Sequence, residues 1–198
     1  MKELFRLSVF AGLLIGTGGL VYLHVGGVIG AVLFAFGLIC VVVCKAQLYT
    51  GKAGFLPRNE QYRLLPMLVG NAIGCALVAL LTLYATNELV GEHLDKILAA
   101  RQAASWHGIL VPSIGTGMLM TLAVLGTQRG TFLPLLFAVP LFILCGLPHC
   151  VADAFYYAAG IFRGSYDHGM WLSWVMAIAG NWIGCNLPRL FLQKSFTA

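Results

Sequence analysis

Six long apolar stretches constrain the fold of this chain more than any other feature of its sequence. They cover residues 7–23, 25–56, 64–86, 106–128, 130–162 and 169–188. A helix of about 20 apolar residues crosses the hydrocarbon core of a bilayer, which is about 30 Å thick. Only 10% of the residues are charged, whereas an average soluble domain has about 25%. We therefore predict a single all-α integral membrane domain over residues 1–198, with six transmembrane helices.

The basic residues between the stretches predict the orientation, because cytoplasmic loops are enriched in Lys and Arg. Six spans place both termini on one side. That side carries Lys2, Arg6, Lys52, Arg58, Arg63, Arg129, Arg189 and Lys194, and the other side carries Lys96, Arg101 and Arg163. Both termini are therefore predicted to be cytoplasmic. The net charge of +5 follows from this topology, and without a basic soluble face we expect no nucleic-acid partner.

Two of the stretches are too long for one straight helix. Residues 130–162 would measure about 50 Å as a helix, well above the thickness of the hydrocarbon core, and residues 25–56 are almost as long. A break in each helix would relieve the excess. The sequences "QLYTGKAG" (47–54) and "GLPHC" (146–150) are the predicted break points, since Gly frees the backbone and Pro removes a donor. We assign the breaks to Gly51 and Gly54 in the first stretch and to Pro148 in the second.

A repeated hexapeptide divides the chain into two similar halves. "GNAIGC" occurs at 70–75 and "GNWIGC" at 180–185, each after a broken stretch. Each half, about 1–86 and 106–192, contains three spans, so the second half must enter the membrane inverted. Inverted repeats with broken helices that meet near the midplane are typical of transporters. We therefore predict an aquaporin-like architecture of two inverted three-helix repeats.

Several motifs resemble the formate/nitrite transporter family. The family's second span ends in Gly-Ala-Glu-Leu-Phe-Thr-Gly, and this chain reads "KAQLYTG" at 45–51. Its fifth span carries Gly-Phe-Glu-His-Ser followed by Asn and Met, and this chain reads "GLPHCVADAF". Both Gly-Asn-x-Ile-Gly elements are present. The resemblance extends from about Leu7 to Leu192.

The resemblance implies a homopentamer in the prokaryotic inner membrane, surrounded by lipid, with one pore through each protomer. It implies a channel or transporter for small monovalent weak-acid anions such as formate, nitrite or hydrosulfide, rather than an enzyme, with no cofactor and no metal. The central histidine would be His149 and the polar residue of the broken second span Thr50. The resemblance also assigns apolar constrictions and a vestibule cation: Leu38, Leu48, Phe142 and Arg101.

Four residues depart from the family pattern. Gln47 and Pro148 replace the acid of each broken span, and Lys45 and Asp153 replace a glycine and an asparagine. Charged residues within a membrane bundle usually face the interior and form pairs. We therefore predict an intramembrane ion pair between Lys45 and Asp153. In the alternative interpretation, Lys45 extends toward the cytoplasmic surface and Asp153 caps the short helix after the break.

The chemistry of His149 suits anion transport. An anion in an apolar pore loses its hydration at a large free-energy cost. Helix N-termini at the breaks would offset part of that cost. Histidine has an ordinary pKa of about 6.5 and exchanges protons near neutrality, so His149 would convert formate or nitrite into the neutral acid. Thr50 would hydrogen-bond the anion during the exchange.

Two other functions remain open at this stage. In a metal or redox protein of the membrane, Cys40 and Cys44 on one helix face, or Cys145 and Cys150 with His149, would bind copper or zinc. No Cys-x-x-Cys spacing supports this, and the cysteines are also consistent with small core residues. In the second alternative, the pore conducts a neutral solute such as water, ammonia or urea.

Overall fold

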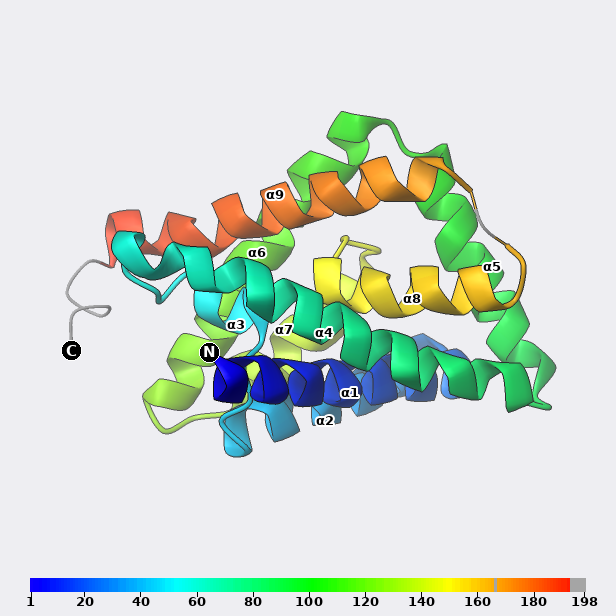
Figure 1. Cartoon of the computed structure of the whole chain (residues 1–198), viewed down its shortest axis with the longest axis horizontal. Helices are drawn as coiled ribbons and strands as arrows, with labels where there is room; N and C mark the ends of the chain where they lie inside the picture. Colours follow the sequence, from blue (N-terminus) through cyan, green and yellow to red (C-terminus); the bar gives the residue numbers. More distant parts are fainter. Residues whose placement is uncertain (166, 193–198) are drawn as a thin grey trace.

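The computed structural model describes residues 1–165 and 167–192, and the chain forms an all-helical bundle (Figure 1). The predicted all-α class is confirmed. The first half contains α1 (Lys2–Val25), α2 (Gly27–Val43), α3 (Tyr49–Ala53), η1 (Arg58–Arg63), α4 (Leu64–Ala79) and η2 (Leu80–Tyr84). The second half contains α6 (Trp106–Gln128), α7 (Leu133–Leu144), α8 (Cys150–Phe162) and α9 (Gly169–Phe191), and α5 (Glu88–Ala103) connects the halves. Lys194, counted in the orientation argument, lies outside the described residues.

Three of the described helical segments are long and apolar enough to cross a membrane alone: α1, the continuous segment Arg58–Tyr84, and α6. The apolar helices α2, α7 and α8 are shorter, with 17, 12 and 13 residues. They are pieces of the two broken stretches, α2 with α3 and α7 with α8. Helix α9 has 23 residues and packs along α6, as α4 packs along α1. The count of six spans stays a prediction.

The two halves run in opposite directions. Helix α1 begins at the left of Figure 1 and runs to the right, whereas α6 runs from the right to the left. The short helix of each break packs against the last helix of the other half, α3 on α9 and α8 on α4. The start of α1 and the end of α9 lie at the same end of the bundle. These matching contacts support an inverted repeat, and we keep 1–86 and 106–192 as its proposed boundaries.

Both breaks begin with the same helix-ending motif. Cys44 and Cys145 end α2 and α7, and the next residues, Lys45 and Gly146, have left-handed backbones with φ of 53° and 65°. The N–H groups of these two residues and of their successors bond back to the last turn of the helix, as in a Schellman motif. The breaks therefore cover residues 44–48 and 145–149.

The predicted break in the first half was placed too late. Gly51 lies inside α3, and Gly54 caps that helix with a right-handed backbone, φ −82°. The chain leaves α2 before either glycine, at Lys45. The break was predicted at the glycines because glycine frees the backbone, whereas a left-handed lysine is uncommon. In the second half the break lies at "GLPHC", as predicted.

Helix α5 lies across the end of the bundle opposite the start of α1 (Figure 1). The side chain of Asn87 caps its first turn by accepting the N–H of Leu89 at 3.0 Å. Val90, Leu94 and Leu98 are buried, and their spacing of four places them on one helix face. Arg101 follows three residues after Leu98, so the same face directs it into the bundle.

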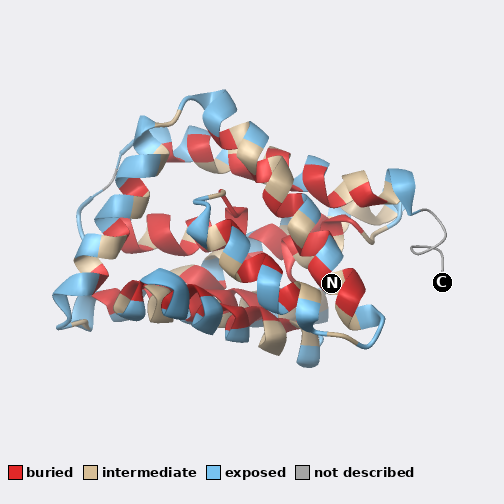
Figure 2. Ribbon diagram, turned by 180° about the vertical axis from the view of Figure 1, so that it is seen from behind, coloured by how far each residue is buried: buried red, intermediate tan, exposed pale blue. Residues whose placement is uncertain are grey.

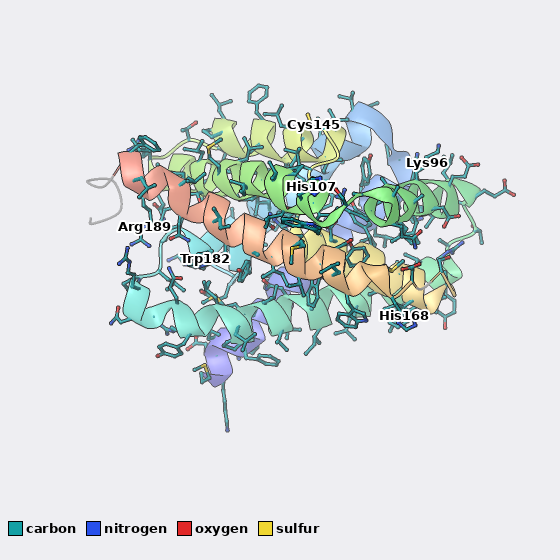
Figure 3. All side chains as sticks on the ribbon, turned by 90° about the horizontal axis from the view of Figure 1, so that it is seen from above. Lys96, His107, Cys145, His168, Trp182 and Arg189 are labelled. Carbon is teal, nitrogen blue, oxygen red and sulfur yellow. The ribbon has the colours of Figure 1, made fainter. Side chains whose placement is uncertain are left out.

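The outer surface is apolar along much of its length. Figure 2 shows buried residues on the inward faces of the helices and exposed residues outside. The exposed residues of α2 and α7 include Val28, Ile29, Phe36, Leu133 and Phe137. Figure 3 shows polar side chains at the ends, with Arg189 at one end and Lys96 and His168 at the other. This distribution is typical of helices surrounded by lipid.

Candidate functional site

The two breaks bring Thr50 and His149 together in the centre of the bundle. Thr50 lies in the first turn of α3, and His149 is the N-cap residue of α8. The Thr50 Oγ1 and His149 Nε2 atoms are 3.0 Å apart. Both residues are buried, with exposed fractions of 0% and 2%. The two polar residues predicted for the centre of the pore therefore contact each other directly.

The position of His149 at the N-cap assigns its neutral tautomer. The backbone N–H of Ala152 points to His149 Nδ1 at a distance of 3.1 Å. A backbone N–H is only a donor, so Nδ1 must accept, and the proton of the neutral ring is on Nε2. His149 then donates this proton to the hydroxyl oxygen of Thr50. The hydroxyl hydrogen of Thr50 stays available for another acceptor.

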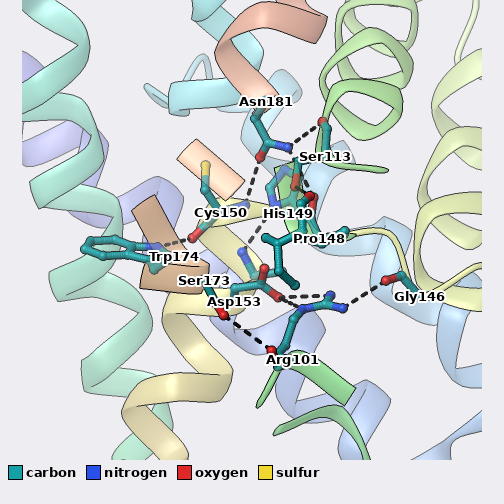
Figure 4. A network of polar contacts seen from close by, with 12 residues as sticks. Arg101, Ser113, Gly146, Pro148, His149, Cys150, Asp153, Ser173, Trp174 and Asn181 are labelled. Atoms are coloured by element: carbon teal, nitrogen blue, oxygen red, sulfur yellow. Dashed lines mark hydrogen bonds and ion pairs between the residues drawn. The ribbon is translucent and has the colours of Figure 1, made fainter. Parts of the chain in front are cut away.

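Asn181 holds the second break in place from α9 (Figure 4). Its Oδ1 accepts the N–H of Cys150 at 2.8 Å. Its Nδ2 donates to the carbonyl of Pro148 at 3.1 Å and to the carbonyl of Ser113 on α6 at 2.9 Å. One buried amide thus satisfies both sides of the break next to His149 and connects it to the long helices.

Asn71 holds the first break in the same way. Its Oδ1 accepts the N–H of Tyr49 at 2.9 Å, and its Nδ2 donates to the carbonyls of Gln47 and Ser8 at 2.9 and 2.8 Å. Asn71 and Asn181 are the asparagines of the two repeated hexapeptides. The hexapeptides indicated the repeat and the family resemblance, but Asn71 and Asn181 were not predicted as part of the site.

Buried cysteines connect the two halves. Cys75 on α4 donates to the carbonyl of Val151, and Cys185 on α9 donates to the carbonyl of Thr50, both at 3.3 Å. Across the described part of the chain, no group of three or more His, Cys, Asp or Glu residues is placed to hold a metal ion. The thiols therefore act here as small core residues that satisfy backbone carbonyls at the breaks.

A hollow lies on each side of the Thr50–His149 contact. The N-side hollow, at the end where α1 begins, has a volume of about 350 Å³ and is lined by Leu38, Leu48 and Lys45 among others. The α5-side hollow has a volume of about 220 Å³ and is lined by Phe142 and His149 among others. Leu48 and Gly51, close to Thr50 in the chain, line the N-side hollow, and His149 lines the α5-side hollow, so the buried contact lies between the two.

Apolar side chains flank this contact on both sides. Leu38 and Leu48 are almost fully buried on the N-side, and Phe142 is buried on the α5-side. The Phe142 ring stacks on the imidazole of His149 with ring centroids 5.1 Å apart, and Phe34 contacts Phe142 edge-on at 6.0 Å. Of the three predicted constriction residues, Leu38 and Leu48 thus line the N-side hollow, and Phe142 lines the α5-side hollow.

Arg101 and Asp153 form an ion pair in the α5-side hollow (Figure 4). The Arg101 Nε and Nη2 atoms lie 3.3 and 3.2 Å from Asp153 Oδ1, and Nη1 donates to the carbonyl of Gly146 at 2.9 Å. The other carboxylate oxygen, Oδ2, is buried without a hydrogen-bond partner among the described residues. The predicted vestibule cation thus lies in a hollow, fixed to α8 and to the break.

The predicted ion pair between Lys45 and Asp153 is wrong. Lys45 is exposed and lines the opposite hollow. Asp153 does not cap α8 either, because His149 does. The error has a physical cause: Lys45 lies within the first break, Asp153 lies after the second, and the two halves run in opposite directions, so the two residues line opposite hollows. Only the placement of α5 across one end provides Asp153 with a cation.

We expect the substitution Lys45→Gly to stabilise the protein. A left-handed backbone costs a non-glycine residue about 1–2 kcal/mol, and the flexibility of glycine in the unfolded chain offsets part of the gain. A net gain of about 0.5–1 kcal/mol would raise the melting temperature in detergent by about 1–4 °C. The control is Ala46→Gly in the same loop, where φ is not positive and the melting temperature should fall. An equal fall in both variants would contradict the prediction.

The chain is similar in sequence to known transport proteins. Residues 1–190 match the sequence model of the formate/nitrite transporter family. The protein described as "Uncharacterized transporter YrhG" from Bacillus subtilis (strain 168) is 31% identical over 219 aligned positions, which cover 93% of this chain and 81% of that protein.

Two solved structures share the fold. The first is described as "Pentameric formate channel with formate bound" and has a TM-score of 0.83 at 17% identity, with 98% of this chain and 96% of that chain covered. The second is described as "FNT family ion channel" and has a TM-score of 0.75 at 19% identity, with 94% and 86% covered.

Proposed function

This chain belongs to the formate/nitrite transporter family, and we propose that it carries small monovalent weak-acid anions such as formate or nitrite across a membrane. The family and the structural neighbours are channels and transporters rather than enzymes. The observation that carries the proposal is the buried contact between Thr50 and His149, which lies between two hollows and is flanked by apolar side chains.

The hydrogen-bond donors at the centre suit an anion. The first backbone N–H groups of α3 and α8 donate to Asn71 and Asn181, so these two groups are not free to bind an anion, although both helix ends contribute their dipoles. Two side-chain donors meet at the centre, the hydroxyl of Thr50 and the Nε2–H of His149. An anion that enters between them accepts a hydrogen bond from each. This geometry favours a carboxylate or nitrite oxygen over a solute that must donate.

We propose further that His149 exchanges a proton with the anion. The imidazolium gives its Nε2 proton to an anion oxygen, and the neutral acid then passes the apolar side chains of Leu48 or Phe142. Formation of the imidazolium requires a proton on Nδ1 and therefore release of the Ala152 N–H. The stacked ring of Phe142 favours the positive ring through a cation–π contact, since its centroid lies within about 6 Å.

The remaining assignments belong to the same proposal. We propose a homopentamer by analogy with the pentameric formate channel that shares the fold. We also propose a prokaryotic inner membrane, contact with lipid, and both termini cytoplasmic, the last from the distribution of Lys and Arg. Leu38, Leu48 and Phe142 act as the apolar constrictions. Arg101 attracts anions at the α5-side hollow, where Asp153 adjusts the local charge, and Lys45 lies at the opposite mouth.

Liposome uptake tests the proposal. Reconstituted protein should accelerate the uptake of formate or nitrite over protein-free liposomes, with a rate that increases as the pH falls from about 8 to 5. The uptake of urea and of ammonia, two neutral solutes, is measured in parallel assays. Uptake of a neutral solute with no acceleration of any weak acid would reject anion transport and favour a neutral-solute pore.

A further inference from the structure

The inverted repeat places opposite charges at equivalent positions of the two pore halves. Leu48 and His149 are the N-cap residues of α3 and α8, with extended backbones at φ −102° and −123°. Lys52 follows Leu48 by four residues, and Asp153 follows His149 by four residues. Lys52 lines the N-side hollow, and Asp153 lines the α5-side hollow. The two mouths of the pore are therefore related in backbone and opposite in charge.

The two residues also differ in their partners. Asp153 is paired with Arg101, so its charge is compensated. Lys52 is half-buried, and within residues 1–165 and 167–192 its ammonium group has neither a hydrogen bond nor an ion pair. Unpaired charges in membrane bundles are costly and usually mark a ligand or ion pathway. A half-buried ammonium group without a protein partner is suited to bind an anion.

No acidic side chain near Lys52 compensates its charge. Lys52 also lines a second hollow of about 360 Å³, next to the first, which Glu3 and Arg63 line as well. Glu3 forms no ion pair with Lys52 among the described residues, and Glu60 is bonded to Arg63. The charged groups that line the two hollows are therefore mainly basic.

We propose that Lys52 forms an anion-binding site in the N-side hollow, where a small weak-acid anion is held before it reaches Thr50. The site would hold the anion by a charge-assisted hydrogen bond from the ammonium group. Gln47, which lines both hollows with Lys52, is the neighbouring polar side chain. At the matching position of the α5-side hollow, Asp153 provides an acidic side chain paired with Arg101 instead of an unpaired ammonium group. This inference rests on the proposed anion transport and makes the pore asymmetric.

Formate binding to the purified oligomer tests the site without any flux measurement. Sodium formate should raise the melting temperature in detergent in a saturable manner, because a ligand that binds only the folded state stabilises it. In Lys52→Gln, the half-saturating formate concentration should rise about tenfold, the effect of losing one charge-assisted hydrogen bond. Without formate, Lys52→Gln should melt no lower than the wild type, because an unpaired ammonium contributes no stabilising contact.

Two variants make the result specific. Lys52→Arg retains the charge and should keep the half-saturating concentration within about twofold of the wild type. Lys2→Gln removes the same charge at an exposed position on the same end of the bundle and should also change it less than twofold. An unchanged value in Lys52→Gln, or an equal rise in Lys2→Gln, would overturn the site. Formate binding that depends on Lys52 in a protein without weak-acid flux would instead reject the proposed transport and leave the site standing.

Discussion

Replacement of His149 by Asn is expected to reduce formate uptake at pH 5 by about a hundredfold, since a positioned proton donor contributes about 10²–10⁴ in rate. Asn has no titratable proton, so uptake should also lose its increase toward low pH. The side chain of Asn caps helices as well as Asp or Ser does and should still accept the N–H of Ala152 that His149 Nδ1 accepts. The fold should therefore survive while the proton exchange is lost. Uptake into liposomes, corrected for protein-free liposomes at each pH, measures both effects.

Two comparisons separate proton exchange from a loss of structure. His149→Phe removes both the proton and the cap, so it should lower uptake and also the melting temperature. Thr50→Val removes the hydroxyl but keeps His149, and it should lower uptake while leaving the pH dependence in place. If His149→Asn and the wild type showed the same uptake and pH dependence, the proton-exchange mechanism would be rejected.

Most of the fold could be predicted from the length of the apolar stretches. A 33-residue run without a polar connection cannot be one straight span, and this alone indicated a break near His149. The first break was harder to place, because Lys45 adopts a backbone that glycine usually provides. The packing of the repeat imposes the helix-ending motif at Lys45. The conformational preference of lysine alone does not predict it.

The pairing of Asp153 with Arg101 could not be predicted from the spacing of residues in the sequence. Arg101 reaches Asp153 only because α5 folds across the end of the bundle, 52 residues earlier in the chain. By contrast, Asn71 and Asn181 could have been identified from the sequence. A buried amide requires partners, a broken membrane helix leaves backbone groups that require partners, and each broken stretch is followed by one Asn of the repeated hexapeptide.

The substitution Asn181→Leu should therefore destabilise the protein by about 3 kcal/mol or more. It leaves the N–H of Cys150 and the carbonyls of Pro148 and Ser113 without their partner. Each unsatisfied buried group costs about 1–3 kcal/mol, and leucine, although similar in size to asparagine, can satisfy none of them. Because Pro148 precedes His149 directly, the imidazole should also lose its fixed position between the hollows.

A second asparagine on α9 provides the matched control for this test. The Nδ2 of Asn186 donates to the carbonyl of Trp182 on the same helix, near the surface, so Asn186→Leu should cost less than about 1 kcal/mol. Melting in detergent compares the stabilities, and uptake by any surviving oligomer compares the pores.

The repeat adds a stricter condition: Asn71→Leu should destabilise about as much as Asn181→Leu, because Asn71 makes the three equivalent hydrogen bonds. The uptake that remains should nevertheless differ, since Asn71 fixes the break that ends at Leu48, and Asn181 fixes the one that carries the proton donor. Equal stability of Asn181→Leu and Asn186→Leu would mean that the amide does not hold the break.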